Sequence, residues 1–319
     1  MNLIFCGTPQ FAVPTLEILL ERHYSIERVL TNPDEPAGRG YEIQLSPVKR
    51  AAEKAGLPLF QPRKLRDSEA EAVLSKYHPD AIVVVAYGHI IPPWMIARPR
   101  LGCINLHASL LPKLRGAAPI PWAIIRGERV TGVTTMMIDE GLDTGPILLS
   151  REEPIQDDDV TETLSERLSV IGAELVAETL EGLERGTISP RPQDAGSATL
   201  APMLKKEDGV IDWTLSAEEI SRRVRGLRPW PRAATTFRGK RLEIWMALPS
   251  PEVPAPRGGP ARAHPPAGTL RAVDGKLRVA TGNGPELDVM ELQLEGRKRL
   301  TARDFLNGVR VAPGERFGT

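Results

Sequence analysis

Two polar side chains share one face of a predicted strand, at the point where that strand enters a loop. Asn105 and His107 stand two positions apart in the segment GCINLHASLLP, and side chains on a strand alternate between its faces, so both point the same way. Asp143 lies in a second loop, GLDTGP, after the next strong strand. If the two strands are neighbours, the carboxylate comes beside the amide and the imidazole, where α/β sheets bind ligands.

These three groups suit acyl transfer. An amide can donate to a developing oxyanion, an imidazole can move a proton near neutral pH, and a carboxylate can fix the tautomer of the imidazole. Each also has an ordinary structural interpretation, because Asn-x-His occurs on strands and Asp is common in turns. Ser109 is nearby but lies outside a G-x-S-x-G elbow, so we expect direct transfer to a substrate nucleophile without an acyl-enzyme.

The sequence argues against several cofactors. The first strand ends in CGTP rather than G-x-G-x-x-G, and no Walker A pattern occurs, which excludes the usual dinucleotide and P-loop nucleotide sites. The two cysteines, Cys6 and Cys103, are too few for a Cys-based zinc site, and the five histidines show no metal-ligand spacing. We therefore expect no metal.

Strands alternate with helices over the first half of the chain. The clearest strand is AIVVVA at 81–86, a β-branched run typical of a buried parallel strand. Ser46 is a suitable N-cap for a helix over 47–55, and 160–184 has the pattern of a long amphipathic helix. Other strands are expected at 2–6, 26–30, 102–106, 132–138 and 147–155, and other helices at 14–22, 69–77 and 120–126. The alternation predicts a doubly wound α/β sheet, mostly parallel.

The second half has a different pattern. A Pro-, Gly- and Ser-rich stretch from 185 to about 203 indicates a linker, and a helix is expected at 217–225. Short strand-like runs with turn signals follow at 234–237, 241–247, 268–272, 276–280 and 288–294, which is typical of a small β-barrel. Residues 249–268 hold seven Pro and three Gly and predict a surface loop, whose role the sequence does not reveal.

Charge is divided unevenly along the 319 residues. Residues 1–204 carry 20 Lys and Arg against 27 Asp and Glu, and residues 205–319 carry 21 against 14, so the net charges are −7 and +7. A basic half is a weak indication of an anionic partner such as nucleic acid. No apolar run reaches the roughly 18–20 residues of a membrane span and no secretory signal opens the chain, so we expect a cytoplasmic protein without a membrane partner.

The site motif resembles that of the folate-dependent formyltransferase family. The resemblance is carried by N-x-H-x-S-L-L-P from Asn105, by Arg115-Gly116 downstream, and by Asp143 in GLDTGP. It implies that Asn105, His107 and Asp143 are catalytic. It also implies 10-formyltetrahydrofolate as the formyl donor, held partly by four residues, Ser109, Leu110, Leu111 and Pro112.

Further motifs, over nearly the whole chain, are similar to the branch of this family that formylates initiator methionyl-tRNA. They are FCGTPQFAVPTLEIL, TNPDEPAGRG, SPVK, LFQP, KKEDGVIDW and RGLRPWPRAATTF. The resemblance implies a Rossmann-like catalytic domain over 1–188, a linker over 189–206 and an OB-like tRNA-binding domain over 207–319. The α-amino group of the esterified methionine would attack the formyl carbon. Asn105 and His107 would stabilise the oxyanion, and Asp143 would orient His107 or relay a proton through water.

The resemblance also implies contacts with the tRNA. The loop 34–49 would reach the acceptor stem through Arg39 and Lys49, which matter more here because YEIQL at 41–45 replaces a stretch that is typically Lys-bearing. In the basic half, Lys205 and Lys206 would contact phosphates. Arg222 and Arg225 share one side of the predicted helix and would belong to the same surface.

Two other classes of protein stay open at this point. A small-molecule formyltransferase would act on a sugar amine or a purine precursor, but it would have little use for a basic C-terminal half. A non-catalytic RNA-binding protein would not need Asn105, His107 and Asp143 together, and with 5% aromatic residues the barrel offers no series of stacking side chains. We expect a monomer.

Overall fold

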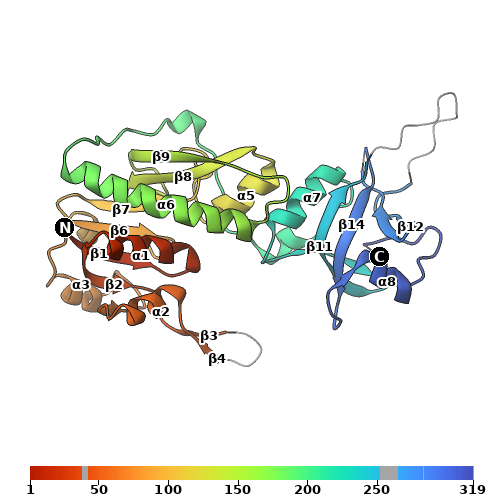
Figure 1. Ribbon diagram of the computed structural model, residues 1–319, viewed down its shortest axis with the longest axis horizontal. Coiled ribbons are helices and arrows are strands. Elements are labelled where there is room, and N and C mark those ends of the chain that lie inside the picture. The colour runs from red at the N-terminus through yellow and green to blue at the C-terminus, as the bar shows by residue number, and fades with distance from the viewer. Residues whose placement is uncertain (38–41, 252–264, 283, 319) are drawn as a thin grey trace. The chain divides into compact units, whose positions relative to one another are not determined.

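The computed structural model describes residues 1–37, 42–251, 265–282 and 284–318 (Figure 1). The chain forms two compact units. The first comprises Met1–Pro119, Val130–Pro154 and Leu164–Pro202, and the second comprises Ile120–Arg129, Ile155–Thr163 and Met203–Thr319. Arg39 and residues 252–264 of the Pro-rich stretch, for which the sequence made predictions, lie outside the described residues.

A seven-stranded sheet is the centre of the first unit, in the order β5-β2-β1-β6-β7-β8-β9. Its first five strands pair in parallel, whereas β7 and β8, and β8 and β9, are antiparallel. The strands are β1 (Asn2–Gly7), β2 (Ser25–Leu30), β5 (Leu59–Phe60), β6 (Ala81–Val85), β7 (Cys103–His107), β8 (Val130–Met137) and β9 (Ile147–Pro154). The expected Rossmann-like, mostly parallel sheet is confirmed.

The position of β6 explains its composition. It lies between β1 and β7, and all five of its side chains are buried, so neither face has room for a polar residue. The predicted cap is also present, since Ser46 Oγ accepts a hydrogen bond from the Lys49 amide at 3.0 Å. The helices of this unit are α1 (Val13–Glu21), α2 (Pro47–Lys54), α3 (Ser68–Leu74), α4 (Pro93–Ile96) and, from Leu164 onward, α6 (Thr161–Glu184).

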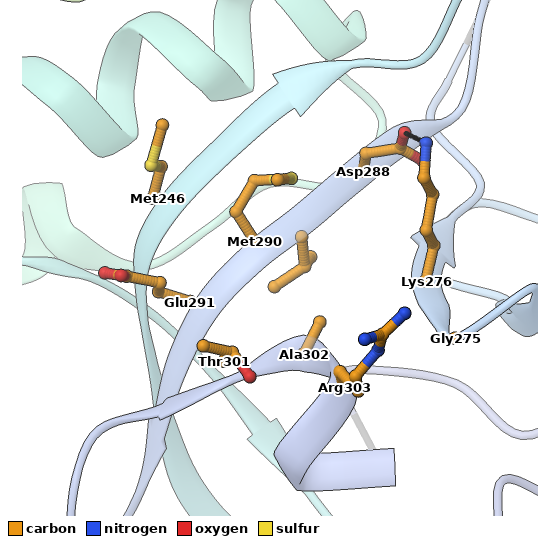
Figure 2. A pocket seen from close by; sticks show the side chains of 10 residues that line it. Met246, Gly275, Lys276, Asp288, Met290, Glu291, Thr301, Ala302 and Arg303 are labelled. Carbon is orange, nitrogen blue, oxygen red and sulfur yellow. Dashed lines mark ion pairs between the residues drawn. The ribbon is translucent and has the colours of Figure 1, made fainter.

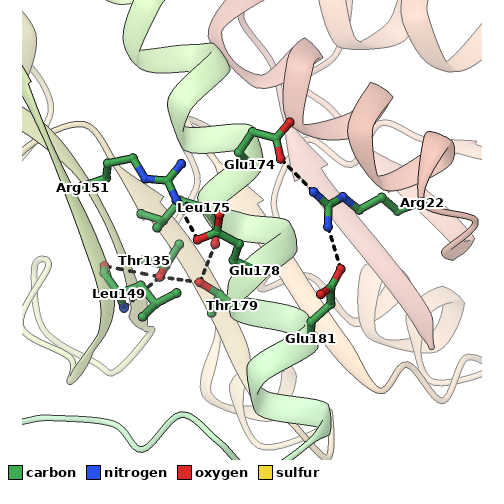
Figure 3. Close-up of polar contacts among 9 residues, drawn as sticks. All are labelled: Arg22, Thr135, Leu149, Arg151, Glu174, Leu175, Glu178, Thr179 and Glu181. Atoms are coloured by element: carbon green, nitrogen blue, oxygen red, sulfur yellow. Dashed lines mark hydrogen bonds and ion pairs between the residues drawn. The ribbon is translucent and has the colours of Figure 1, made fainter.

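Polar contacts join α6 to the end of α1 (Figure 3), and one glycine lets α6 lie close on the sheet. Arg22, at the end of α1, donates to Glu174 at 2.8 Å and to Glu181 at 2.6 Å. These two glutamates are two helical turns apart and therefore share one side of α6. At Gly172 a Cβ atom would lie 2.6 Å from Leu106 Cδ2. The glycine thus lets α6 lie close on β7, the strand that carries Asn105 and His107.

An antiparallel sheet is the centre of the second unit, in the order β10-β11-β14-β13-β12, with β15 paired to β14. The strands are β10 (Ala233–Phe237), β11 (Lys240–Pro249), β12 (Leu270–Val273), β13 (Lys276–Val279), β14 (Leu287–Leu294) and β15 (Leu300–Thr301). The helices are α5 (Pro119–Arg126, from Ile120 on), α7 (Ala217–Gly226) and α8 (Ala302–Gly308). A separate C-terminal all-β sheet is therefore confirmed. A capping box between Ser216 and Glu219 begins α7.

Several short elements were not expected from the sequence. They are the hairpin β3 (Glu35–Ala37) and β4 (Glu42–Gln44), helices α4 and α8, strand β15 and the 3₁₀ turns Gln10–Ala12, Ala195–Ser197 and Lys206–Gly209. Across the described ranges, no helix has the length and apolar character needed to cross a membrane. In the same ranges, no three His, Cys, Asp or Glu side chains gather so that they could hold a metal ion.

Candidate active site

The ring of His107 is held by a backbone carbonyl. His107 ends β7 and is only 6% exposed. Its Nε2 lies 2.9 Å from the carbonyl oxygen of Leu114. A carbonyl oxygen can only accept, so Nε2 carries a proton and donates it to this bond. In the neutral ring the lone pair is therefore on Nδ1, and Nδ1 is the nitrogen left for chemistry.

Asp143 faces that nitrogen. Its Oδ2 lies 3.6 Å from His107 Nδ1, which is longer than a hydrogen bond, and accepts from the Gly116 amide at 2.7 Å. At this separation a proton on Nδ1 makes no hydrogen bond to Asp143 and stays available to another acceptor, whereas a small approach would complete a charge-assisted bond. The two groups are thus placed to share a proton, while the bond that orients the ring comes from Leu114.

The loop that carries Asp143 is constrained on both sides of it. Asp139 Oδ1 accepts from the Gly141 amide at 3.0 Å and from Thr144 Oγ1 at 2.8 Å. At Gly145 a Cβ atom would lie 1.8 Å from the Met137 carbonyl oxygen, so no larger residue fits. Asp143 itself has a φ of +52°, in the left-handed region. The sequence argument required the strands before the two loops to be neighbours, and β7 and β8 are neighbours. Because they are antiparallel, the strands themselves do not bring Asp143 to His107, and the long loop after β8 does so.

Asn105 stands two residues before His107 on β7, opposite Met136 of β8, and is partly exposed. The alternation of side chains on the strand puts it on the same face as His107. The structure therefore brings His107 and Asp143 together, with Asn105 on the adjoining strand position. Their catalytic roles stay a prediction.

The four residues predicted to hold the donor do not have equal access to it. Ser109 is fully buried, and its hydroxyl donates to the Lys113 carbonyl at 2.6 Å. Leu111 is 7% exposed. Leu110 and Pro112 are partly exposed. Ser109 and Leu111 thus support the turn from inside, and Leu110 and Pro112 are the members of the set that a ligand could touch.

Sequence reasoning gave no role to three groups that contact the site, although Gly116 is part of the family motif. Two are backbone groups, the Leu114 carbonyl and the Gly116 amide, which no side-chain pattern reveals. The third is Gln193, whose amide nitrogen donates to the Asp143 carbonyl at 2.8 Å. Gln193 stands in the stretch expected to be a linker. The one feature of the sequence that could have indicated its role is a large amide side chain in a segment with few others.

Two of the residues predicted to contact tRNA are exposed and one is largely enclosed. Lys205 and Lys206 are exposed at the start of a 3₁₀ turn. Lys49 is 15% exposed and forms an ion pair with Asp34, which also accepts from Gln61 at 3.0 Å. Hydrogen bonds from Lys49 and Gln61 hold the pKa of Asp34 below its usual value. Lys49 therefore supports the base of the β3–β4 hairpin, and its predicted contact with tRNA stays untested.

The two predicted arginines of α7 are engaged within the second unit. Arg222 is 25% exposed and lies 3.4 Å from Glu218 one turn earlier. Arg225 donates to the Asp159 carbonyl at 2.7 Å, and burial lowers the pKa of its guanidinium. Of the pair, Arg222 has the more accessible charge.

The same unit has a cluster of arginines around one tryptophan ring. Three guanidinium carbons lie over the ring of Trp245, those of Arg228, Arg232 and Arg299, at 5.8, 4.2 and 4.7 Å from its centroid. Each of these arginines also pairs with a carboxylate, in the order Glu162, Glu243 and Glu291. The cluster is therefore largely neutralised within the protein.

A surface hollow of about 260 Å³ lies between β14 and the start of α8 (Figure 2). Met246 and Met290 form its apolar part, each 40% exposed. Lys276, on its rim, lies 3.9 Å from Asp288. The hollow has one ion pair at its edge and an open apolar floor, and it contains none of the predicted site residues.

A Rossmann-like sheet with acid–base side chains at the carboxyl end of a central strand, joined to a C-terminal antiparallel sheet, is the architecture of a class of two-domain transferases. Within that class, the chain belongs to the formyl transferase family. The family profile described as formyl transferase matches residues 1–180, and the one described as formyl transferase, C-terminal domain, matches residues 203–310. The expected enzyme class is thereby confirmed.

Individual relatives agree over their full length. A methionyl-tRNA formyltransferase of Koribacter versatilis is 52% identical over 319 residues, covering 100% of this chain and 99% of that protein. One of Geobacter metallireducens is 47% identical, with the same coverage.

Solved structures share the fold at lower identity. Methionyl-tRNA formyltransferase from Clostridium thermocellum gives a TM-score of 0.54 at 20% identity, covering 77% of this chain and 92% of that one. HypX from Aquifex aeolicus, solved in complex with tetrahydrofolic acid, gives 0.63 at 20% identity, covering 98% of this chain and 48% of that one. These structures support the fold, and the curated relatives support the family.

Proposed function

We propose that this protein transfers the formyl group of 10-formyltetrahydrofolate to the α-amino group of methionine on initiator tRNA. The observation that carries the proposal is the similarity over the whole chain to methionyl-tRNA formyltransferases, at 52% and 47% identity. The pairing of His107 and Asp143 at 3.6 Å supports a reaction that moves protons between an amine and a leaving nitrogen.

The chemistry follows from the geometry of the site. The neutral amine forms a C–N bond to the formyl carbon, and the carbonyl electrons move onto its oxygen. The Asn105 amide and a protonated His107 Nδ1 would donate to this oxyanion. Collapse breaks the bond between the carbon and N10 of the folate, which takes a proton as it leaves. The proton that the amine loses passes to Asp143, directly or through water, and Asp143 returns a proton to N10 as that nitrogen leaves, so that no proton is gained or lost overall.

His107 can serve this reaction only through Nδ1. Its Nε2 is occupied by the Leu114 carbonyl at 2.9 Å, so one tautomer of the neutral ring is enforced. The division of work between His107 and Asp143 stays part of the proposal. If the His107→Asn variant kept nearly full turnover, the role given to His107 would be wrong.

The folate donor requires an apolar surface beside these groups. Leu142 is next to Asp143 in the chain and is 64% exposed, and Ile90, in the loop after β6, is 70% exposed. Single exposed apolar side chains are common on protein surfaces, so position is what favours these two: Leu142 adjoins Asp143, and β6 and β7 are parallel neighbours, so the loop after β6 lies at the same end of the sheet as His107. We infer that they contact the flat ring system of the donor, with Leu110 and Pro112 from the adjacent turn.

The tRNA would be held mainly by charge. Residues 205–319 carry 21 basic against 14 acidic side chains, and Lys205 and Lys206 are exposed. Contacts of this kind read the phosphate backbone and weaken with salt. The protein would then act in the cytoplasm, where aminoacylated tRNA enters translation, and we expect it to act as a monomer.

The experiment is formyl transfer from 10-formyltetrahydrofolate, with four acceptors compared. They are methionine-charged initiator tRNA, methionine-charged elongator tRNA, free methionine and an amino sugar nucleotide. Transfer to the initiator alone, lost in the His107→Ala variant, is the expected result. Transfer to the amino sugar nucleotide but to no tRNA would refute the proposed acceptor and favour a small-molecule formyltransferase.

A further inference from the structure

The segment from Gln193 to Ala201, here called the strap, contacts both loops that hold the proposed catalytic pair. We infer that Gln193 and Thr199 of the strap are positioning residues for Asp143 and His107. The inference rests on the proposed function for its kinetic consequence, but its structural part can be tested without any substrate. The strap lies in the stretch that the sequence presents as a linker, and within the first unit.

Gln193 joins the two loops through one side-chain amide. Its Nε2 donates to the carbonyl oxygens of Asp143 at 2.8 Å and of Gly145 at 2.7 Å. Its Oε1 accepts from the guanidinium of Arg115, from Nη2 at 2.7 Å and from Nε at 3.1 Å. Both amide protons and the amide oxygen are therefore in use, and the loop of Asp143 is tied to the loop that follows His107.

Thr199 acts on His107 through one intermediate residue. Its Oγ1 accepts from the Leu114 amide at 2.9 Å, and the Leu114 carbonyl accepts from His107 Nε2 at 2.9 Å. Backbone bonds continue the contact, from the Arg115 amide to the Thr199 carbonyl at 2.8 Å and from the Ala201 amide to the Arg115 carbonyl at 2.7 Å. The orientation of the imidazole thus depends on where the strap lies.

The two strap side chains bond to residues whose backbone conformation is strained. Asp143 and Leu114 both have positive φ, at +52° and +58°, where residues with a Cβ are strained. Gln193 bonds the carbonyl of Asp143 itself, and Thr199 bonds the amide of Leu114 itself. Each strained residue of the site has one strap side chain bonded to it, and such conformations persist only where surrounding bonds hold them.

A positioning role differs from general stabilisation in what it predicts. If Gln193 places Asp143, then its loss moves a reacting group without removing any contact to tRNA, so kcat falls while KM for tRNA is unchanged. If Gln193 only stabilises the fold, the remaining folded enzyme keeps its kcat.

The variants separate the individual bonds. Gln193→Met removes all of them with similar volume, and Gln193→Glu keeps an acceptor for Arg115 but has no donor for Asp143 and Gly145. Thr199→Val removes only a hydroxyl. The matched control is Asp194→Ala, because Asp194 is the next residue and bonds Gly196 and Ser197 within the strap.

Two measurements are made on each variant, formyl transfer and amide hydrogen exchange. We expect both Gln193 variants to lose about 10- to 100-fold in kcat, with KM for tRNA within about twofold, and Thr199→Val to lose less. Exchange should quicken in 139–146 for the Gln193 variants and in 110–118 for Thr199→Val. Asp194→Ala should resemble the wild type in both measurements.

Each contrary outcome overturns a defined part of the inference. A loss of kcat with unchanged exchange would mean that Gln193 contacts substrate directly. Faster exchange with unchanged kcat would show that the reaction does not need the strap. If the wild-type protein formylates no tRNA, the proposed function fails, whereas hydrogen exchange still decides whether the strap holds the loops.

Discussion

Replacing Gly116 by alanine should detach the strap from the catalytic loop. Gly116 has a φ of +118°, a conformation that residues with a Cβ rarely adopt, and a Cβ there would lie 2.7 Å from the carbonyl oxygen of Ala201. The Cβ is attached directly to the backbone and the carbonyl oxygen is part of it, so no side-chain rotation can relieve the contact. The same glycine donates its amide to Asp143 Oδ2 at 2.7 Å, so the displacement reaches the proposed catalytic carboxylate.

The magnitude follows from the local bonds. The backbone strain costs about 1–3 kcal/mol. Two hydrogen bonds next to the contact, from the Ala201 amide to the Arg115 carbonyl at 2.7 Å and from the Ala118 amide to the Ala201 carbonyl at 3.2 Å, contribute about 1 kcal/mol each. The sum of about 3–5 kcal/mol raises the population with an open strap by roughly two to four orders of magnitude. We expect local opening, because the sheet does not depend on these bonds.

The assay is amide hydrogen exchange at Ala201 together with kcat for formyl transfer. In Gly116→Ala we expect the protection of the Ala201 amide to be lost and kcat to fall at least tenfold. Gly186→Ala is the control, since Gly186 also has a positive φ, of +67°, but a Cβ there meets nothing within 4 Å. The reasoning is refuted if the two variants are alike in Ala201 protection and in kcat.

Three further predictions concern other groups. Leu142→Ala should raise KM for the folate donor about tenfold, since it removes about 1.5 kcal/mol of apolar contact, and should leave KM for tRNA unchanged; steady-state kinetics with each substrate varied would show otherwise. Lys49→Met should lower Tm at pH 7, and the difference from the wild type should shrink as the pH falls below ~4, because the stability that comes with the depressed pKa of Asp34 is lost as the pH falls through the folded pKa; a pH-independent difference in thermal melts would contradict this. Lys206→Ala should weaken tRNA binding and reduce the slope of log affinity against log salt by about 1, with an unchanged slope in titrations as the contrary result.

Much of the fold could be predicted from the sequence, because strands and helix caps depend on patterns among neighbouring residues. The β-branched run is buried on both faces over 81–85 as β6, and Ser46 caps α2 through its own hydroxyl. The side-chain alternation of a strand predicted that Asn105 and His107 share a face. Such patterns depend on neighbours within a few residues, so one sequence contains them.

The hydrogen bonds that hold the site in place could not be predicted from the sequence, because they join distant residues or are made by backbone groups. The bond from His107 ends on a carbonyl, which every residue has. Gln193 bonds Asp143 across 50 positions, and composition marked its segment only as rich in Pro, Gly and Ser. A tertiary hydrogen bond leaves no periodicity in the sequence, so the stretch was interpreted as a linker although Thr199 and Ala201 bond the catalytic loop.

The edges of the seven-stranded sheet affect how the protein behaves at high concentration. An unpaired edge is a template on which a strand of another molecule can add, which is the first step of sheet aggregation. One edge, β5, is only two residues long. At the other, β9 is closed at Ile147 by two backbone bonds with Arg191, each 2.8 Å, and continues with the charged run Arg151–Glu153. The residues just before the strap thereby protect an edge, so cleaving the chain near Arg191 should promote self-association as well as slow the reaction.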